Sequence, residues 1–312
     1  MQCAGRARGR RRARRAAGGM AGCNCLRGRP ALLWTVTLLA NFCCALNGGV
    51  ITLTIPTLAA EFGCSVETAA WVAFAPNFFA AMCGPSLGKA ADTFGRSKAW
   101  WSGMFMFISS FVICAYSTSI EMMVVGRTLS GIAWATTGPA GFGILASTLE
   151  RSQRGVASSL QTATGTLGSS IGVALGGLLM DLGSWRLIFI LPILPLFSVF
   201  LLSLLVLPLD GGSSGTPRKD GRKLEREEFD LAGSIVFALF IGSFLLGVNR
   251  GNDVGWGTPF VIALFVASVV LFPTLIVIER RAPNPVLPLS LVRDRVTFAA
   301  MSCLILAGVC CE

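Results

Sequence analysis

The stretch GKAADTFGRSK, residues 88–98, lies between two strongly apolar runs, WVAFAPNFFAAMCG at 71–84 and AWWSGMFMFISSFVICAY at 99–116. It is made of small, charged and turn-forming residues, and Gly88 and Gly95 allow a backbone reversal that other residues resist. A bilayer core of about 30 Å needs about 20 apolar residues per helix, a length that both runs reach with their flanks. The stretch therefore predicts a tight charged loop between two membrane-spanning helices.

The composition of the whole chain extends this prediction. With 53% hydrophobic and 13% charged residues and a mean hydropathy of +0.69, the 312 residues carry more apolar surface than one soluble core could hide. We expect an all-α integral membrane protein in the lipid bilayer, with about eight complete transmembrane helices and a partial ninth. The predicted spans are 31–59, 68–87, 99–117, 122–149, 155–182, 185–208, 231–248 and 259–278, followed by a run at 296–311 that stops short.

The positive charges predict the orientation. Residues 1–30 hold nine Arg and no acid, and the loops after the second, fourth, sixth and eighth runs are also basic. The alternate loops hold only Arg186 and Arg250, so the N-terminus is expected in the cytoplasm. The net charge of +10 then reflects topology rather than binding of nucleic acid. We expect the plasma membrane, but an Arg-rich, acid-free tail also fits an organelle transit peptide, although it contains no Ser.

The residue content gives little support for an enzyme active site or a metal site. The chain has no His, the commonest general base, and its spans hold no cluster of acids. Most of the eleven cysteines lie in apolar runs, where a thiol acts as a small hydrophobe, and without His a zinc site at Cys23 and Cys25 is improbable. We therefore expect neither an enzyme nor a metal or other cofactor.

The loop at 88–98 resembles the segment between spans two and three of the major facilitator superfamily, G-x-L-A-D-R-x-G-R-K. Gly88, Asp92, Gly95 and Arg96 match this pattern and Lys98 adds to the charge network, so the expected gating residues are Gly88, Asp92, Gly95, Arg96 and Lys98. The resemblance implies that Asp92 closes a cytoplasmic gate by meeting a second half of the protein. An ordinary basic cytoplasmic loop is the alternative.

Two further spans carry motifs in the expected order. GRTLSGIAWA, residues 126–135, resembles the family motif R-x-x-Q-G-x-G-x-A, with Arg127 and Gly131 in place. Burying Arg127 costs about 2.5–3.5 kcal/mol, so it should face a polar cavity or a partner, unless it extends to the membrane surface from a helix end. GTLGSSIGVALGG, residues 165–177, resembles the antiporter motif G-x-x-x-G-P-x-x-G-G, with Val173 in place of Pro. Its small residues predict close helix packing at Gly168, Gly172, Gly176 and Gly177.

Other stretches resemble the fourteen-span drug:proton antiporters of this superfamily. They are LNGGVITLTIP at 46–56, SWRLIF at 184–189, LGVNRGNDVGWG at 246–257 and NPVLPLSLVRDRVTF at 284–298. The resemblance implies export of small lipophilic or amphipathic compounds by alternating access, with a substrate cavity that includes Asn47, Thr52, Asn77 and Arg127. An anionic group of the substrate could pair with Arg127.

Proton coupling is where the sequence departs from that subfamily. Asn47 stands where the family has an Asp that is regarded as the proton carrier, and an amide cannot titrate. Protons would then couple through another acid, or the protein would facilitate transport or bind without pumping.

The expected domains follow from the spans and the resemblance. They are a basic cytoplasmic tail at 1–30, a six-helix transporter half at 31–208, a cytoplasmic linker at 209–229, two additional helices at 230–280, and a loop with the start of a second half at 281–312. The rest of that second half would be needed in the same or another chain. The alternative function is a transport-inactive scaffold or a partnered half-size protein.

Overall fold

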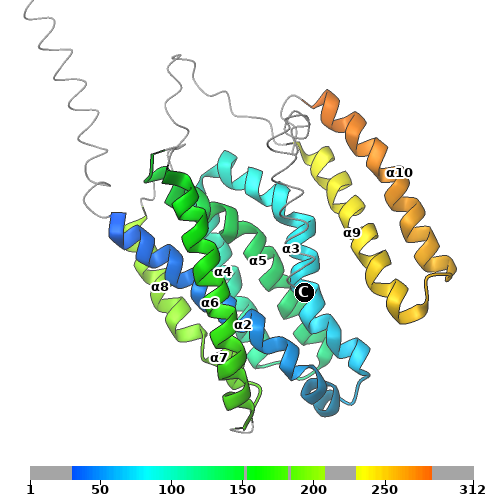
Figure 1. Ribbon diagram of the computed structural model, residues 1–312, viewed down its shortest axis with the longest axis horizontal. Coiled ribbons are helices and arrows are strands. Elements are labelled where there is room, and N and C mark those ends of the chain that lie inside the picture. Colours follow the sequence, from blue (N-terminus) through cyan, green and yellow to red (C-terminus); the bar gives the residue numbers. More distant parts are fainter. Residues whose placement is uncertain (1–29, 151–152, 182–183, 208–229, 283–312) are drawn as a thin grey trace, which may run out of the picture.

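The computed structural model describes residues 30–150, 153–181, 184–207 and 230–282, and within these ranges the chain is helical without any strand (Figure 1). The helices are α2 (Pro30–Phe62), α3 (Val66–Phe94), α4 (Arg96–Ala115), α5 (Ile120–Ser147), α6 (Arg154–Asp181), α7 (Leu187–Ile190), α8 (Ile193–Val206), α9 (Leu231–Val254) and α10 (Pro259–Arg281). The predicted all-α membrane bundle is confirmed.

Seven helical segments in the described part are long and apolar enough to cross a membrane, with α7 and α8 counted as one segment, Leu187–Val206. The helix outside this set is α5, which has 28 residues and carries Arg127 with many Gly, Ser and Thr. It packs between α3 and α4, and more than half of its residues are buried. A helix that is shielded from lipid by its neighbours does not need an apolar surface. The predicted partial ninth span lies outside the described residues.

The loop predicted at 88–98 is shorter than expected. Helix α3 continues to Phe94 and α4 begins at Arg96, so the reversal takes place at Gly95, whose φ is 108°. Such a φ strains any residue with a Cβ, which explains the glycine. Gly88 lies inside α3, where a Cβ would be in ordinary contact with Pro139 at 3.5 Å. The prediction that Gly88 forms part of the turn is wrong, because Gly95 alone reverses the chain.

The sixth predicted span, 185–208, is broken into α7 and α8. Pro192 lies between them, and a proline has no N–H to donate to the carbonyl four residues earlier. That carbonyl belongs to Ile188, inside the bundle, and it needs a donor from elsewhere.

Helices α2 to α8 form one group, and α9 and α10 form a hairpin beside it (Figure 1). The hairpin packs on α3 through α9, where a Cβ at Gly242 would lie 3.0 Å from Sδ of Met82. At one end of the same interface the guanidinium of Arg250 lies over the ring of Trp71, 5.1 Å from its centroid. The predicted tail and linker lie outside the described residues, apart from Pro30.

The most extensive contact between two helices in the described part joins α2 and α6, and glycines make it possible. A Cβ at Gly168 would lie 2.7 Å from the Phe42 carbonyl oxygen, and one at Gly172 would collide with the Leu46 carbonyl. At Gly176 it would lie 2.5 Å from a methyl group of Val50. Gly177 has open space around its Cβ position, so of the predicted packing glycines on α6 it alone lies off this interface.

Candidate functional site

A buried polar contact joins α2 and α5 near the middle of α2. Arg127 Nη1 donates to Asn47 Oδ1 at 2.5 Å, and the two residues are 5% and 2% exposed. Arg127 does not extend to the surface, so the alternative of a side chain that reaches out of the membrane does not apply. Asn47 is the partner that the sequence requires for the buried charge, although it brings a neutral amide instead of a carboxylate.

Two prolines leave backbone carbonyls free to accept hydrogen bonds from the remaining N–H groups of Arg127 and Asn47. Pro76 lies within α3 and cannot donate to the Val72 carbonyl, which instead accepts from Arg127 Nε at 3.0 Å. In the same way Pro192 leaves the Ile188 carbonyl free, and Asn47 Nδ2 donates to it at 3.4 Å. Two carbonyls that prolines release are thus satisfied by one side-chain pair, which ties α2, α3, α5 and α7 together.

Close backbone approach holds this pair in place. A Cβ at Gly131, one helical turn after Arg127, would collide with the backbone of Pro76 in α3. On α2, a Cβ at Gly49 would collide with the Ser169 carbonyl of α6. Gly49 therefore has a packing role that a residue with a Cβ could not fill.

The other two predicted cavity residues do not join the contact. Thr52 is exposed, and its hydroxyl donates to the Gly49 carbonyl of its own helix at 3.2 Å. Asn77 is exposed on α3, and no hydrogen bond of its side chain occurs within the described ranges. A role of either residue in a substrate cavity stays a prediction.

The predicted gating residues lie at the α3–α4 junction. Arg96 Nε donates at 2.7 Å to Asp92 Oδ1, which lies on α3 on the other side of the reversal at Gly95, and Arg96 Nη1 donates to the Gly143 carbonyl of α5 at 3.0 Å. The Arg96 side chain passes close over Gly143, where a Cβ would come within 2.7 Å of it. Asp92 and Lys98 are exposed. Arg96 therefore links the ends of α3, α4 and α5, while the Asp92 carboxylate faces outward.

A second cluster lies at the opposite ends of these helices. Glu61, at the end of α2, accepts from Trp185 Nε1 with one carboxylate oxygen and from Arg186 Nη1 with the other at 2.9 Å. The Arg186 guanidinium lies 4.3 Å from the centroid of the Trp185 ring, and Phe62 meets that ring edge to face. Sequence analysis used Arg186 only for topology, and nothing local to it indicates an acidic partner 125 positions away.

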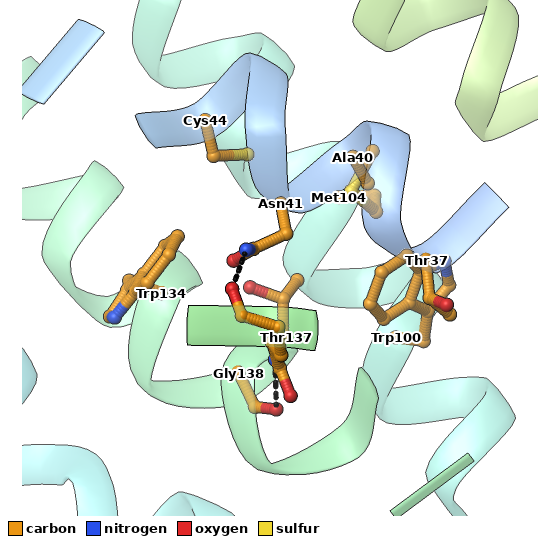
Figure 2. Close-up of a pocket in the computed structure, with 10 residues that line it drawn as sticks. Thr37, Ala40, Asn41, Cys44, Trp100, Met104, Trp134, Thr137 and Gly138 are labelled. Carbon is orange, nitrogen blue, oxygen red and sulfur yellow. Dashed lines mark hydrogen bonds between the residues drawn. The ribbon is translucent and has the colours of Figure 1, made fainter. Parts of the chain in front are cut away.

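A small pocket lies among α2, α4, α5 and α6, and Figure 2 shows its lining side chains. Trp134 and Trp100 lie on either side of Asn41, whose Nδ2 donates to the Gln161 carbonyl at 2.7 Å. The full lining is Thr37, Ala40, Asn41, Cys44, Trp100, Met104, Trp134, Thr137, Gly138 and Gln161. Sequence reasoning did not single out these residues, because a few polar residues among apolar ones do not mark a pocket.

These features together define a multi-pass membrane protein built from a tightly packed helical bundle with a buried arginine. The chain belongs to the Major Facilitator Superfamily, whose family model matches residues 37–311. Among the described residues there is no group of three or more His, Cys, Asp or Glu that could hold a metal ion. Members of this superfamily are membrane transporters, and the expectation that this chain is not an enzyme stays a prediction.

Similar curated proteins lie in the drug-efflux branch, as the sequence motifs predicted. The multidrug export protein EmrB of Escherichia coli K12 is 28% identical over 285 residues, which cover 90% of this chain and 54% of EmrB. The multidrug resistance protein Stp of Mycobacterium tuberculosis is 25% identical, covering 83% of this chain and 46% of Stp. The chain thus spans about half the length of the curated relatives it matches.

Solved structures support the same fold. A crystal structure of the peptide transporter POT aligns with a TM-score of 0.55 at 18% identity and covers 81% of this chain and 52% of the transporter chain. At this identity the likeness concerns the fold alone.

Proposed function

We propose that the protein is a secondary transporter that exports small lipophilic or amphipathic compounds. In this proposal α2 to α8 form one half, which rocks against a second six-helix half around a cavity near the middle of the membrane. The observation that carries it is the buried Arg127–Asn47 contact in a chain of the Major Facilitator Superfamily. The names of EmrB and Stp favour multidrug export as the specific activity.

We further propose that the protein resides in the plasma membrane with its N-terminus in the cytoplasm. The basic tail and the basic even-numbered loops support this orientation. The Asp92–Arg96 pair would then lie at the cytoplasmic face, and the Glu61–Arg186 pair at the outer face.

Residue 47 is proposed not to couple transport to protons. Asn47 accepts from Arg127 and donates to Ile188, the pattern that a carboxylic acid offers only while it is protonated. An ionised carboxylate accepts and cannot donate. Asn47 therefore keeps the hydrogen bonds that a protonated acid would make at this position. In this proposal the substrate crosses the membrane down its own concentration gradient.

A vesicle assay tests the proposed transport and its lack of coupling. The native full-length protein, reconstituted in liposomes, should move ethidium or Hoechst 33342 at a rate that changes less than about twofold when nigericin collapses the pH gradient. The variant Asn47→Asp can take up a proton and should become dependent on that gradient, whereas Asn252→Asp, at an exposed position of α9, should not. Absence of dye movement by the intact protein would instead support a transport-inactive scaffold.

The gating proposal predicts that Asp92 matters for transport more than for stability. The Asp92–Arg96 pair is exposed and contributes at most about 1 kcal/mol, so Asp92→Asn should leave the melting temperature nearly unchanged. If Asp92 meets the second half when the cytoplasmic side closes, the same variant should slow transport at least about tenfold. Glu150→Gln, at an exposed acid just after the end of α5, is the matched control and should retain transport. Equal rates for both variants and the unaltered protein would refute the gate.

A further inference from the structure

Two arginines lie on the side of the bundle that the proposed orientation places outside, and their charges are balanced differently. Arg186 donates to the Glu61 carboxylate at 2.9 Å. The side chain of Arg250, near the end of α9, makes no hydrogen bond within the described ranges. Its acidic neighbour Asp253 is 3.9 Å from Arg250 Nη1, which is beyond hydrogen-bonding distance. The N–H groups of Arg250 are therefore available for an acceptor.

An aromatic ring holds the Arg250 guanidinium in position. The guanidinium lies 5.1 Å from the ring centroid of Trp71 on α3, the helix against which α9 packs (Figure 1). The Arg250 side chain is 36% exposed, so it is partly covered by the protein and partly accessible from outside. A planar guanidinium that is stacked on a ring is pre-organised, and it loses less entropy for each hydrogen bond it forms with a ligand.

Two tryptophans place this guanidinium at the level of the lipid headgroups. Trp71 lies in the second turn of α3, and Trp256 lies between α9 and α10 and is 55% exposed. Trp is enriched where the membrane meets water. Toward the middle of the membrane, the exposed side chains of α9 are apolar, namely Ile235, Leu239, Phe244 and Val248. An acyl chain can therefore follow α9 from a headgroup at Arg250.

We propose that Arg250, stacked on Trp71, binds the phosphate group of a phospholipid whose acyl chains cover α9 beside α3. A guanidinium binds phosphate through two parallel charge-assisted hydrogen bonds, and Arg250 has the free N–H groups for them. The lipid would contact both helices and so stabilise the attachment of the α9–α10 hairpin to the bundle. Its assignment to the outer leaflet rests on the proposed orientation, whereas the site itself does not depend on transport.

Native mass spectrometry of the full-length protein in detergent tests the site with defined lipids. Dioleoyl phosphatidylglycerol carries one phosphate, and dioleoylglycerol has the same acyl chains without it. We expect saturable binding of a first phosphatidylglycerol molecule, which Arg250→Gln should weaken at least about threefold. Dioleoylglycerol should bind more weakly, and equally to both proteins. Equal affinities of Arg250→Gln and the unaltered protein for phosphatidylglycerol would overturn the proposal.

Further variants separate a specific contact from a general attraction to positive charge. Arg250→Lys keeps the charge without the two-pronged geometry and should also weaken binding. Asp253→Asn removes the nearby acid and should strengthen it. Arg186→Gln is the matched control, because Glu61 already balances the charge of Arg186, and it should bind the lipid as the unaltered protein does. A loss in Arg186→Gln as large as that in Arg250→Gln would mean that the lipid responds only to net charge, against the proposal.

A soluble phosphate distinguishes a lipid site from a site for free anions. Glycerol 3-phosphate offers the same phosphate chemistry without acyl chains, and an excess of it should not displace phosphatidylglycerol. Displacement would assign Arg250 to soluble anions and overturn the proposal.

Thermal unfolding gives a second readout of the same site. Because a ligand of the folded state stabilises it, phosphatidylglycerol should raise the melting temperature of the unaltered protein more than that of Arg250→Gln. Equal shifts would contradict the site. None of these measurements involves movement of dye, so their failure leaves the proposed transport untouched, and failure of transport leaves the lipid site in place.

Discussion

The variant Asn47→Ala should melt far below the unaltered protein, because it removes the side chain that, among the described residues, accepts a hydrogen bond from the buried Arg127 guanidinium. The Arg127 guanidinium would keep one acceptor, the Val72 carbonyl, and the Ile188 carbonyl would lose its donor. Leaving a buried polar group without its hydrogen-bond partner costs about 1–3 kcal/mol, and more where that group is charged. The measurement is thermal unfolding of the purified protein in detergent, followed by the loss of monodisperse material.

A double variant shows whether the stranded charge causes this loss. In Asn47→Ala combined with Arg127→Met the charge is gone, so the pair of changes should cost less than the sum of the two single changes. Thr52→Ala is the control on the same helix, because Thr52 is exposed and bonds only its own helix. A single variant Asn47→Ala as stable as Thr52→Ala would show that the Arg127–Asn47 contact does not hold the bundle together.

The spans could be predicted from sequence because each one needs a run of about 20 mostly apolar residues, and many positions contribute to that signal. The predicted span 155–182 and the observed α6, Arg154–Asp181, differ by one residue at each end. Single turns are harder. The charged residues at 88–98 indicate a loop. A helix can nevertheless include charged residues beyond its apolar part, and α3 continues to Phe94. One residue with a positive φ, Gly95, then reverses the chain.

The candidate site was predictable in part. A charge in an apolar run requires a partner, which singled out Arg127, and the spacing of small residues singled out the α6 face. The partners could not be predicted from local sequence. Pro76 and Pro192 indicate that two backbone carbonyls lack their helical donors. The side chains that donate to these carbonyls instead lie 55 and 141 positions away in the sequence. The pocket around Asn41 depends in the same way on how four helices cross.

Gly172→Val should abolish most of the folded protein, because no adjustment of a side chain can make room for it. A Cβ at Gly172 collides with the backbone carbonyl of Leu46, so α2 and α6 would have to separate along the whole interface that also holds Gly168 and Gly49. Overpacking alone costs about 1–3 kcal/mol, and the separation adds to it. Gly177→Val is the matched control in the same motif and should accumulate as the unaltered protein does, since its Cβ position is open.

The neighbouring position Gly176 makes the cause of the loss testable. There the obstructing atoms belong to the Val50 side chain, so Gly176→Ala should reduce the folded yield and Val50→Ala should partly restore it. No change at residue 46 can restore Gly172→Val, because every residue has a backbone carbonyl. Yield and monodispersity of the membrane-extracted protein measure both effects. Equal yields for Gly172→Val and Gly177→Val would mean that α2 and α6 do not depend on this glycine face, and the position of Asn47 opposite Arg127 would then need another explanation.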